Sequence, residues 1–323
     1  MLEKLKPGIL TKEVVEGLSY FYFSGSEIVT YNDKISIQHP LKTDFQLFVK
    51  AQDLYKLISK LTVEEIALFE KDSKLHVQCK TLKANLSTIE DSEIKTRIDN
   101  VSDSLKKAKW KTLPDNFSDS ISLCMFTASK QESEGTLTCV YVKGKDCISS
   151  DNTRVSHAIL NSDVDNLFLK ASEIKNLIAI TPSKYAVTNS WIHFKNKDKC
   201  IFSIRNIVGD YPDYLQFFDF EGTEVKLPKE IIEGIDITSI LSDPSDPSVK
   251  FKITKGFCTL SVNSEAGTIT HRSKIDYKDK DINFTINPNF LKEMMSHSSS
   301  IIIGKDKAKL QTDNFSLLAL FFS

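Results

Sequence analysis

The chain has 323 residues, and its 42 Lys and Arg against 43 Asp and Glu give a formal net charge of −1. Such a balance gives no overall basic signal for nucleic acid, although one basic face could coexist with an acidic remainder. No apolar run approaches the roughly 20 residues of a membrane span, and the N-terminus lacks an apolar signal core, so we expect a cytoplasmic protein without a membrane partner.

The first third of the chain predicts a helix, a strand–helix unit and a pair of strands. Leu10–Leu18 has the spacing of a helix. The extended run that ends at Lys50 leads into a second helix with an apolar stripe at Leu54, Leu57, Ile58 and Leu61. Strands are predicted over Lys74–Cys79 and Ala84–Ile89. A polar connector, Lys106 to Lys109, follows.

The middle third repeats this order. Pro114 lies just before a predicted helix over Asn116–Ala128, where proline suits a helix start. A strand–helix unit follows around Lys170, with its apolar stripe at Ile174, Leu177 and Ile178. The strands expected here are short and β-branched: Thr136–Val142, Cys147–Ser150, Trp191–Phe194 and Cys200–Ile204.

The last third predicts the same elements once more. Pro228 precedes a helix over Lys229–Leu241, and a later helix has Leu291, Met294 and Met295 on one face. The strands expected in this part are Lys250–Ile253, Phe257–Val262 and the apolar Phe315–Phe322.

The three strand–helix units lie roughly 120 residues apart, a period far longer than the 20–50 residues of solenoid repeats. We therefore predict an α+β protein of three similar domains in line, each with helices on one face of antiparallel sheets. The polar connectors place the domains at residues 1–108, 109–222 and 223–323.

Three segments resemble the bacterial-type DNA polymerase III beta sliding clamp family: Val142–Val155, Phe202–Tyr214, and Phe284–Met295 followed by the strand Phe315–Phe322. Asn152 and Thr153 stand where the family has Gly-His, and Leu318–Phe322 stands where it has Met-Pro-Met-Arg-Leu. These departures suit a divergent, phage-like member.

The resemblance implies a replicative processivity factor in which two subunits, head to tail, form a six-domain ring around duplex DNA. Helices would line the hole and contact phosphates without reading sequence. The implied partners are double-stranded DNA, a DNA polymerase, a clamp loader and a second copy of the chain. The lysines expected to face DNA are Lys12, Lys50, Lys56, Lys170, Lys175, Lys229 and Lys292.

The resemblance also implies an apolar pocket between domains two and three that takes short peptides from partners. Its expected residues are Leu137, Ser150, Asn152, Thr153, Arg154, Val155, Leu318, Ala319, Leu320 and Phe321.

Two other classes compete with this interpretation. A ring of two-domain subunits conflicts with the third repeat, whereas a clamp-fold protein that does not encircle DNA and acts as a monomeric interaction module in replication stays open. The chain has no G-x-S-x-G or G-x-x-x-x-G-K-[ST] motif, and its six histidines are dispersed. Asp151 lies in a turn-like sequence, where it is expected to bond backbone. We expect no enzyme, metal or cofactor, and six free thiols.

Overall fold

The computed structural model describes residues 1–10, 17–63 and 65–322 of the chain. The chain divides into two compact units, Met1–Ser118 with Leu167–Val208, and Asp119–Asn166 with Gly209–Ser323. Most of the helix predicted over Leu10–Leu18 falls outside the described residues. These two units do not coincide with the three predicted domains, because each unit collects the strands of its own sheets. The boundaries at 108 and 222 stay a prediction.

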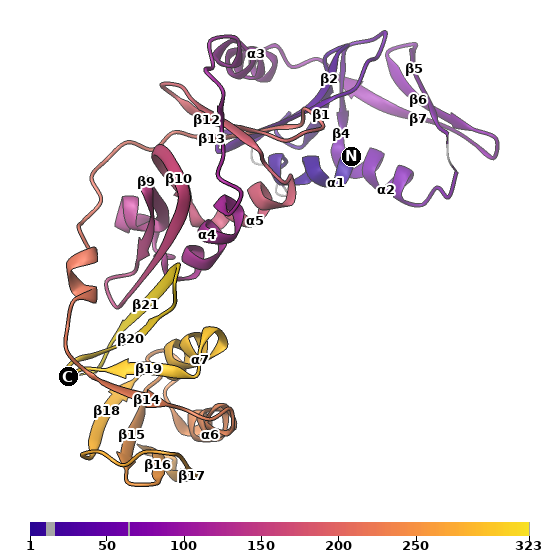
Figure 1. Ribbon diagram of the computed structural model, residues 1–323. Coiled ribbons are helices and arrows are strands. Elements are labelled where there is room, and N and C mark those ends of the chain that lie inside the picture. Colours follow the sequence, from indigo (N-terminus) through magenta and orange to yellow (C-terminus); the bar gives the residue numbers. More distant parts are fainter. Residues whose placement is uncertain (11–16, 64, 323) are drawn as a thin grey trace. The chain divides into compact units, whose positions relative to one another are not determined.

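The first unit is built on one antiparallel sheet of eleven strands (Figure 1). Strand β3 of the first predicted domain pairs with β13 of the second, with Ile37 opposite Phe202. The two predicted domains therefore share a continuous sheet. In order across it the strands are β5 (Ala67–Lys71), β6 (Lys74–Cys79), β7 (Leu82–Ile89), β4 (Leu47–Lys50), β1 (Tyr20–Phe23), β2 (Glu27–Tyr31), β3 (Ile35–Pro40), β13 (Ile201–Arg205), β12 (Trp191–Lys195), β11 (Lys184–Val187) and β8 (Lys111–Thr112).

Helices cover both faces of this sheet. Figure 1 shows α1 (Leu2–Leu5), α2 (Ala51–Ser59) and α5 (Ala171–Ala179) on one side and α3 (Ser92–Lys106) on the other. A short 3-10 turn, η1 (Lys6–Gly8), continues α1. The predicted α+β fold is confirmed, and α3 is a helix that was not predicted from the sequence.

Helix α3 packs through an apolar half and a polar half. Ile94, Ile98 and Val101 join a buried cluster with strand residues that include Tyr22 and Trp191. Toward its C-terminus the helix contacts the buried His193, whose Nε2 lies 3.0 Å from the Ser104 hydroxyl and whose Nδ1 lies 2.8 Å from that of Ser203. Burial lowers the pKa of His193 to about 4.

The repeated strand–helix unit has the same backbone at all three positions. The residue before each helix has φ/ψ of −58/119° at Lys50, −52/118° at Lys170 and −62/120° at Asn287. The helices that follow are α2, α5 and α7 (Pro288–His297). Each strand thus turns into its helix in the same way, as the common phase of the three apolar stripes predicts.

The second unit contains a six-stranded and a four-stranded antiparallel sheet. Helix α6 (Glu230–Thr238) packs on β16 and β17, and α7 packs on β21. The sheets are, in order, β14 (Thr223–Lys226), β19 (Ser300–Ile303), β20 (Lys307–Gln311), β21 (Phe315–Leu320), β10 (Arg154–Lys170) and β9 (Cys139–Ser150), and then β17 (Gly267–Lys274), β16 (Phe257–Ser264), β15 (Val249–Thr254) and β18 (Ile282–Ile286).

The remaining short helices are α4 (Phe117–Cys124), η2 (Met125–Thr127), η3 (Glu132–Thr138), η4 (Leu215–Phe218) and η5 (Ser239–Leu241). The helices predicted over Asn116–Ala128 and Lys229–Leu241 are thereby confirmed. The strand predicted from Thr136 is wrong at its start, because β9 begins only at Cys139. Gly135 has a φ of 56°, and its carbonyl accepts a hydrogen bond from the Thr138 hydroxyl at 2.6 Å, so the chain turns here before it extends.

The six cysteines are free thiols, and five of them are buried. Burial raises the pKa of Cys124 and of Cys258 to about 12. Cys79 is the half-buried one, and hydrogen bonds from Thr81 lower the pKa of its thiol. Within the described residues no helix is both long and apolar enough to cross a bilayer.

Candidate functional site: an apolar pocket beside the last strand

The pairing of β10 with β21 decides which predicted pocket residues share a face. Val155 lies opposite Leu318, and Arg154 lies opposite Ala319. Because successive side chains of a strand point to opposite faces, the first pair lies on one face of the sheet and the second pair on the other. Both pairs belong to the second unit.

An apolar cluster forms on the face of Val155 and Leu318. Its buried members are Ile148, Val155, Tyr214 and Leu318, with exposed fractions between 1% and 8%. Leu137, half-buried, packs against them. The structure therefore brings together three of the predicted residues, Leu137, Val155 and Leu318.

A second part of this cluster comes from the connection between β13 and β14, which we call the aromatic segment (residues 209–220). Five of its residues pack on the cluster or belong to it: Tyr211, Tyr214, Leu215, Phe218 and Phe220. None of them was among the predicted pocket residues. Five aromatic side chains within ten residues of connecting chain are the sequence signal that could have identified them.

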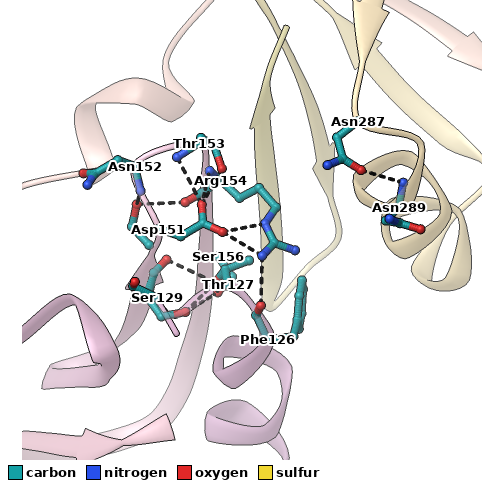
Figure 2. Close-up of polar contacts among 12 residues, drawn as sticks. Phe126, Thr127, Ser129, Asp151, Asn152, Thr153, Arg154, Ser156, Asn287 and Asn289 are labelled. Carbon is teal, nitrogen blue, oxygen red and sulfur yellow. Dashed lines mark hydrogen bonds and ion pairs between the residues drawn. The ribbon is translucent and has the colours of Figure 1, made fainter. Parts of the chain in front are cut away.

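A tight turn joins β9 to β10 (Figure 2), and a hydrogen bond from Tyr214 connects it to the apolar cluster. The Asp151 carboxylate accepts hydrogen bonds from the backbone N–H groups of Thr153 (3.1 Å) and Arg154 (2.8 Å). The buried Ser150 hydroxyl donates to the Arg154 carbonyl at 2.8 Å. Asn152, in the left-handed region at φ 66°, accepts a hydrogen bond from the Tyr214 hydroxyl at 2.8 Å. Asp151 thus has the structural role expected for it.

Arg154 turns away from the pocket face. Its guanidinium donates to the Asp151 carboxylate at 2.7 and 3.0 Å and to the Phe126 carbonyl at 3.2 Å (Figure 2). It also lies 4.2 Å from the centre of the Phe290 ring, a cation–π contact with α7. Arg154 and its partner Ala319 therefore lie on the opposite face of the sheet from Val155 and Leu318. That all four belong to one pocket stays a prediction.

The C-terminal end of β21 carries the remaining predicted residues. Leu320 shares the face of Leu318 and is 40% exposed, and its N–H donates to the Thr153 carbonyl at 2.9 Å. Phe321 stacks on Phe284 with ring centres 4.6 Å apart. Leu320 is thus the exposed apolar end of the pocket face, whereas Phe321 packs toward β18.

A cavity of about 450 Å³ lies on the other side of the aromatic segment from the apolar cluster. His157 and Ser316, which pair across β10 and β21 two residues beyond Val155 and Leu318, form part of its wall. Leu215 and Phe218 form another part, so the aromatic segment lies between the apolar cluster and the cavity. His157 lies 2.8 Å from the Asp146 carboxylate.

The lysines predicted to face DNA differ in their surroundings. Lys56 on α2, Lys175 on α5 and Lys229 before α6 are exposed, whereas Lys50 and Lys170 are half-buried helix caps. Lys292 on α7 is paired with Asp236 of α6 at 2.6 Å. Lys12 lies outside the described residues. Helix α6 contributes three acidic residues and no basic one, so the helix surfaces hold scattered lysines rather than a dense patch.

No protein-family model matches the sequence, and no curated protein matches it by sequence. Its likeness to solved structures is extensive. It covers 100% of this chain and 96% of a DNA polymerase sliding clamp from Pseudomonas aeruginosa, with a TM-score of 0.85 at 13% identity. The DNA polymerase III beta chain of Streptococcus pneumoniae is covered to the same extent, with a TM-score of 0.83 at 19% identity.

A DnaN sliding clamp from Bartonella birtlesii bound to griselimycin also matches over 100% of this chain and 96% of its own, with a TM-score of 0.84 at 13% identity. Since the likeness covers the whole chain, it runs through both compact units. The chain therefore has the fold of the DNA polymerase sliding clamps.

Proposed function

We propose that this protein is a DNA sliding clamp that encircles duplex DNA as a homodimeric ring and tethers a DNA polymerase. The observation that carries the proposal is the likeness to sliding clamps over 100% of this chain and 96% of theirs. A clamp loader would place the ring on DNA, and the protein would act in the cytoplasm. It would hold its partners by position and would catalyse no reaction.

The helix surfaces support contact with DNA that is weak and independent of sequence. The exposed Lys56 and Lys175 lie on equivalent helices of the first and second repeats. Isolated lysines attract phosphates without fixing the protein to one register. The acidic residues of α6 limit the strength of that attraction, which suits a ring that must slide.

The second copy of the chain would bind through an exposed apolar surface in the third repeat. Ile240 of η5 is 73% exposed and Ile237 of α6, three residues earlier in the chain, is 37% exposed. Both η5 and α6 pack beside β17, the edge strand of the four-stranded sheet. Exposed apolar side chains beside the free edge of a sheet favour association with another chain.

The pocket beside β21 would receive short peptides from the polymerase and other partners. It has an apolar floor, a hydrogen-bonded turn connected to it and an exposed leucine at one end, which are the features of a peptide-anchoring site. The bound griselimycin in the Bartonella birtlesii clamp supports a ligand site on this fold.

Solution mass by light scattering over a concentration series tests the ring. A dimer of twice the 36.5 kDa monomer mass is expected. Protein placed on a nicked circular plasmid should then stay bound through gel filtration and be lost once a restriction enzyme linearises the plasmid. A monomer at every concentration that is not retained on circular DNA would instead favour the alternative, a non-encircling interaction module.

A further inference from the structure

We infer that the aromatic segment (residues 209–220) is the pocket's own occupant, which a partner peptide must displace before it binds. The inference rests on the proposed function, because it concerns the regulation and the partner chemistry of the same pocket. It starts from the burial of the floor, since Val155 is 4% and Leu318 1% exposed in the chain by itself. A pocket ready for a partner would leave these anchors open to solvent.

The side chains that cover the floor are those that a peptide ligand would use. Leu215 and Phe218 are three residues apart on the single turn η4, and both pack against the cluster. Residues with this spacing lie above one another on a 3-10 turn, so they present one apolar edge to the sheet. Tyr214, immediately before the turn, is 8% exposed and inserts between the same strands' side chains.

The segment is fastened by side chains rather than by strand pairing. Its backbone forms no strand in the described structure, and η4 is its one turn of helix. Hydrogen bonds from three side chains hold it: the Thr136 hydroxyl to the Asp210 carbonyl at 2.9 Å, the Tyr214 hydroxyl to Asn152 at 2.8 Å, and the Lys309 ammonium to the Phe218 carbonyl at 2.7 Å. Cation–π contacts from Lys307 and Lys309 to aromatic rings of the segment hold it as well. Side-chain contacts of this kind can break in a local opening while the sheets stay folded.

The bond between Tyr214 and Asn152 acts as the latch. The left-handed backbone of Asn152 is held by the Ser150 hydroxyl, which accepts from the Asn152 N–H at 3.0 Å. The latch thus joins the segment to a turn that is itself held by hydrogen bonds. A ligand that binds only the open state is weakened by the fraction of time the pocket is open.

The covering residues also define the chemistry of the partner. A competing peptide should carry an aliphatic and an aromatic side chain one turn apart, as Leu215 and Phe218 are. An attached segment has an effective concentration in the millimolar range, so a partner must bind the open floor well to displace it. Weak or purely apolar contacts from unrelated proteins would not open the pocket.

The test supplies the segment from outside. The probe is a fluorescein-labelled synthetic peptide of residues 211–220, Tyr-Pro-Asp-Tyr-Leu-Gln-Phe-Phe-Asp-Phe. The double variant Leu215→Ser with Phe218→Ser removes the internal anchors and leaves the floor intact. We expect it to bind the peptide saturably and at least tenfold more tightly than the parent protein does. A peptide with serine at the same two positions should not bind.

Two single variants test the latch with the same probe. Tyr214→Phe and Asn152→Gly each remove the hydrogen bond, and glycine keeps the left-handed backbone. Each should bind the peptide about fivefold more tightly than the parent, since one such bond contributes roughly 1 kcal/mol. Tyr214→Phe combined with Asn152→Gly should bind the peptide no more tightly than either single variant, because both changes remove the same hydrogen bond. Tyr277→Phe, which removes a hydroxyl bonded to the Lys280 carbonyl at 2.6 Å, is the matched control and should bind as the parent does.

Each outcome decides something. Equal binding by the parent and the anchor variant, or unchanged binding by both latch variants, overturns the inference, provided thermal melts show that the variants are folded. If the protein is a dimer that is retained on circular DNA but its anchor variant does not bind the peptide, the inference is overturned and the proposed function is not. A monomer that is not retained on DNA but whose anchor variant binds the peptide overturns the ring and leaves the covered pocket standing.

Discussion

Acidification should loosen the attachment of α3 through a single buried histidine. His193 lies between α3 and the sheet with 0% of its surface exposed, and each ring nitrogen is within 3.0 Å of a hydroxyl, on Ser104 and on Ser203. Burial disfavours the charged imidazolium, so the pKa of His193 is lowered from 6.5 to about 4. The unfolded chain takes up this proton near pH 6.5, whereas the folded chain does so only near pH 4.

The size of the effect follows from that difference. Because the unfolded state binds the proton first, stability falls as the pH drops from 6.5 toward 4. At about 1.4 kcal/mol for each pKa unit, the full window corresponds to roughly 3 kcal/mol, and the part between pH 7 and pH 5 to about 2 kcal/mol. This is a large share of the stability of a typical domain.

Urea unfolding followed by tryptophan fluorescence measures this loss in the right place. Both tryptophans of the chain, Trp110 and Trp191, lie in the first unit, and Trp191 belongs to the cluster under α3. Other acids also titrate in this range, so the informative quantity is the difference between the parent and His193→Gln. The parent should lose about 2 kcal/mol more than the variant between pH 7 and pH 5. Parallel losses would refute the reasoning, since they would mean that His193 is protonated in the folded chain.

Three further results are expected. Ile240→Lys, which puts a charge on the 73%-exposed position of η5, should lower the solution mass from dimer to monomer at micromolar protein, and an unchanged mass would exclude this surface from the seam. Lys56→Glu combined with Lys175→Glu should shorten retention on circular plasmid several-fold at low salt and less at high salt, because the attraction to phosphates is screened. Asp151→Asn, which keeps the turn but removes the charge opposite Arg154, should destabilise the second unit by about 2 kcal/mol in calorimetry, since both side chains are less than 20% exposed.

The repeated elements could be predicted because local sequence decides them. Apolar residues at i, i+3 and i+4 predict a helix with one buried face, and this holds whichever sheet the helix packs against. The three equivalent helices and the C-terminal strand were therefore found from the sequence alone. Helix α3 was not, since its stripe of Ile94, Ile98 and Val101 lies in a highly charged stretch. Its partners on the sheet come from distant parts of the chain.

The candidate site was predictable in outline and not in detail. The positions of Val155 and Leu318 in the matched motifs were enough to predict that they lie together. That Arg154 and Ala319 point to the opposite face follows only from how the strands pair, which the motifs do not specify. The aromatic segment covers Val155 and Leu318 because of the path that this connection takes across the sheet. No periodic sequence pattern specifies the path of a connection without regular structure. Likewise, nothing in the local sequence around Lys292 indicates its ion pair with Asp236, 56 residues earlier.

The chemistry of the thiols makes the chain ready for single-molecule work without mutation. Buried thiols with a raised pKa react slowly with maleimides, because the thiolate is the reactive form. Cys79, at the end of β6 in the first unit, is half-buried and has a lowered pKa, so a short reaction should place one dye on each chain there. Counting bleaching steps on DNA would then report how many copies of the chain each molecule of plasmid holds.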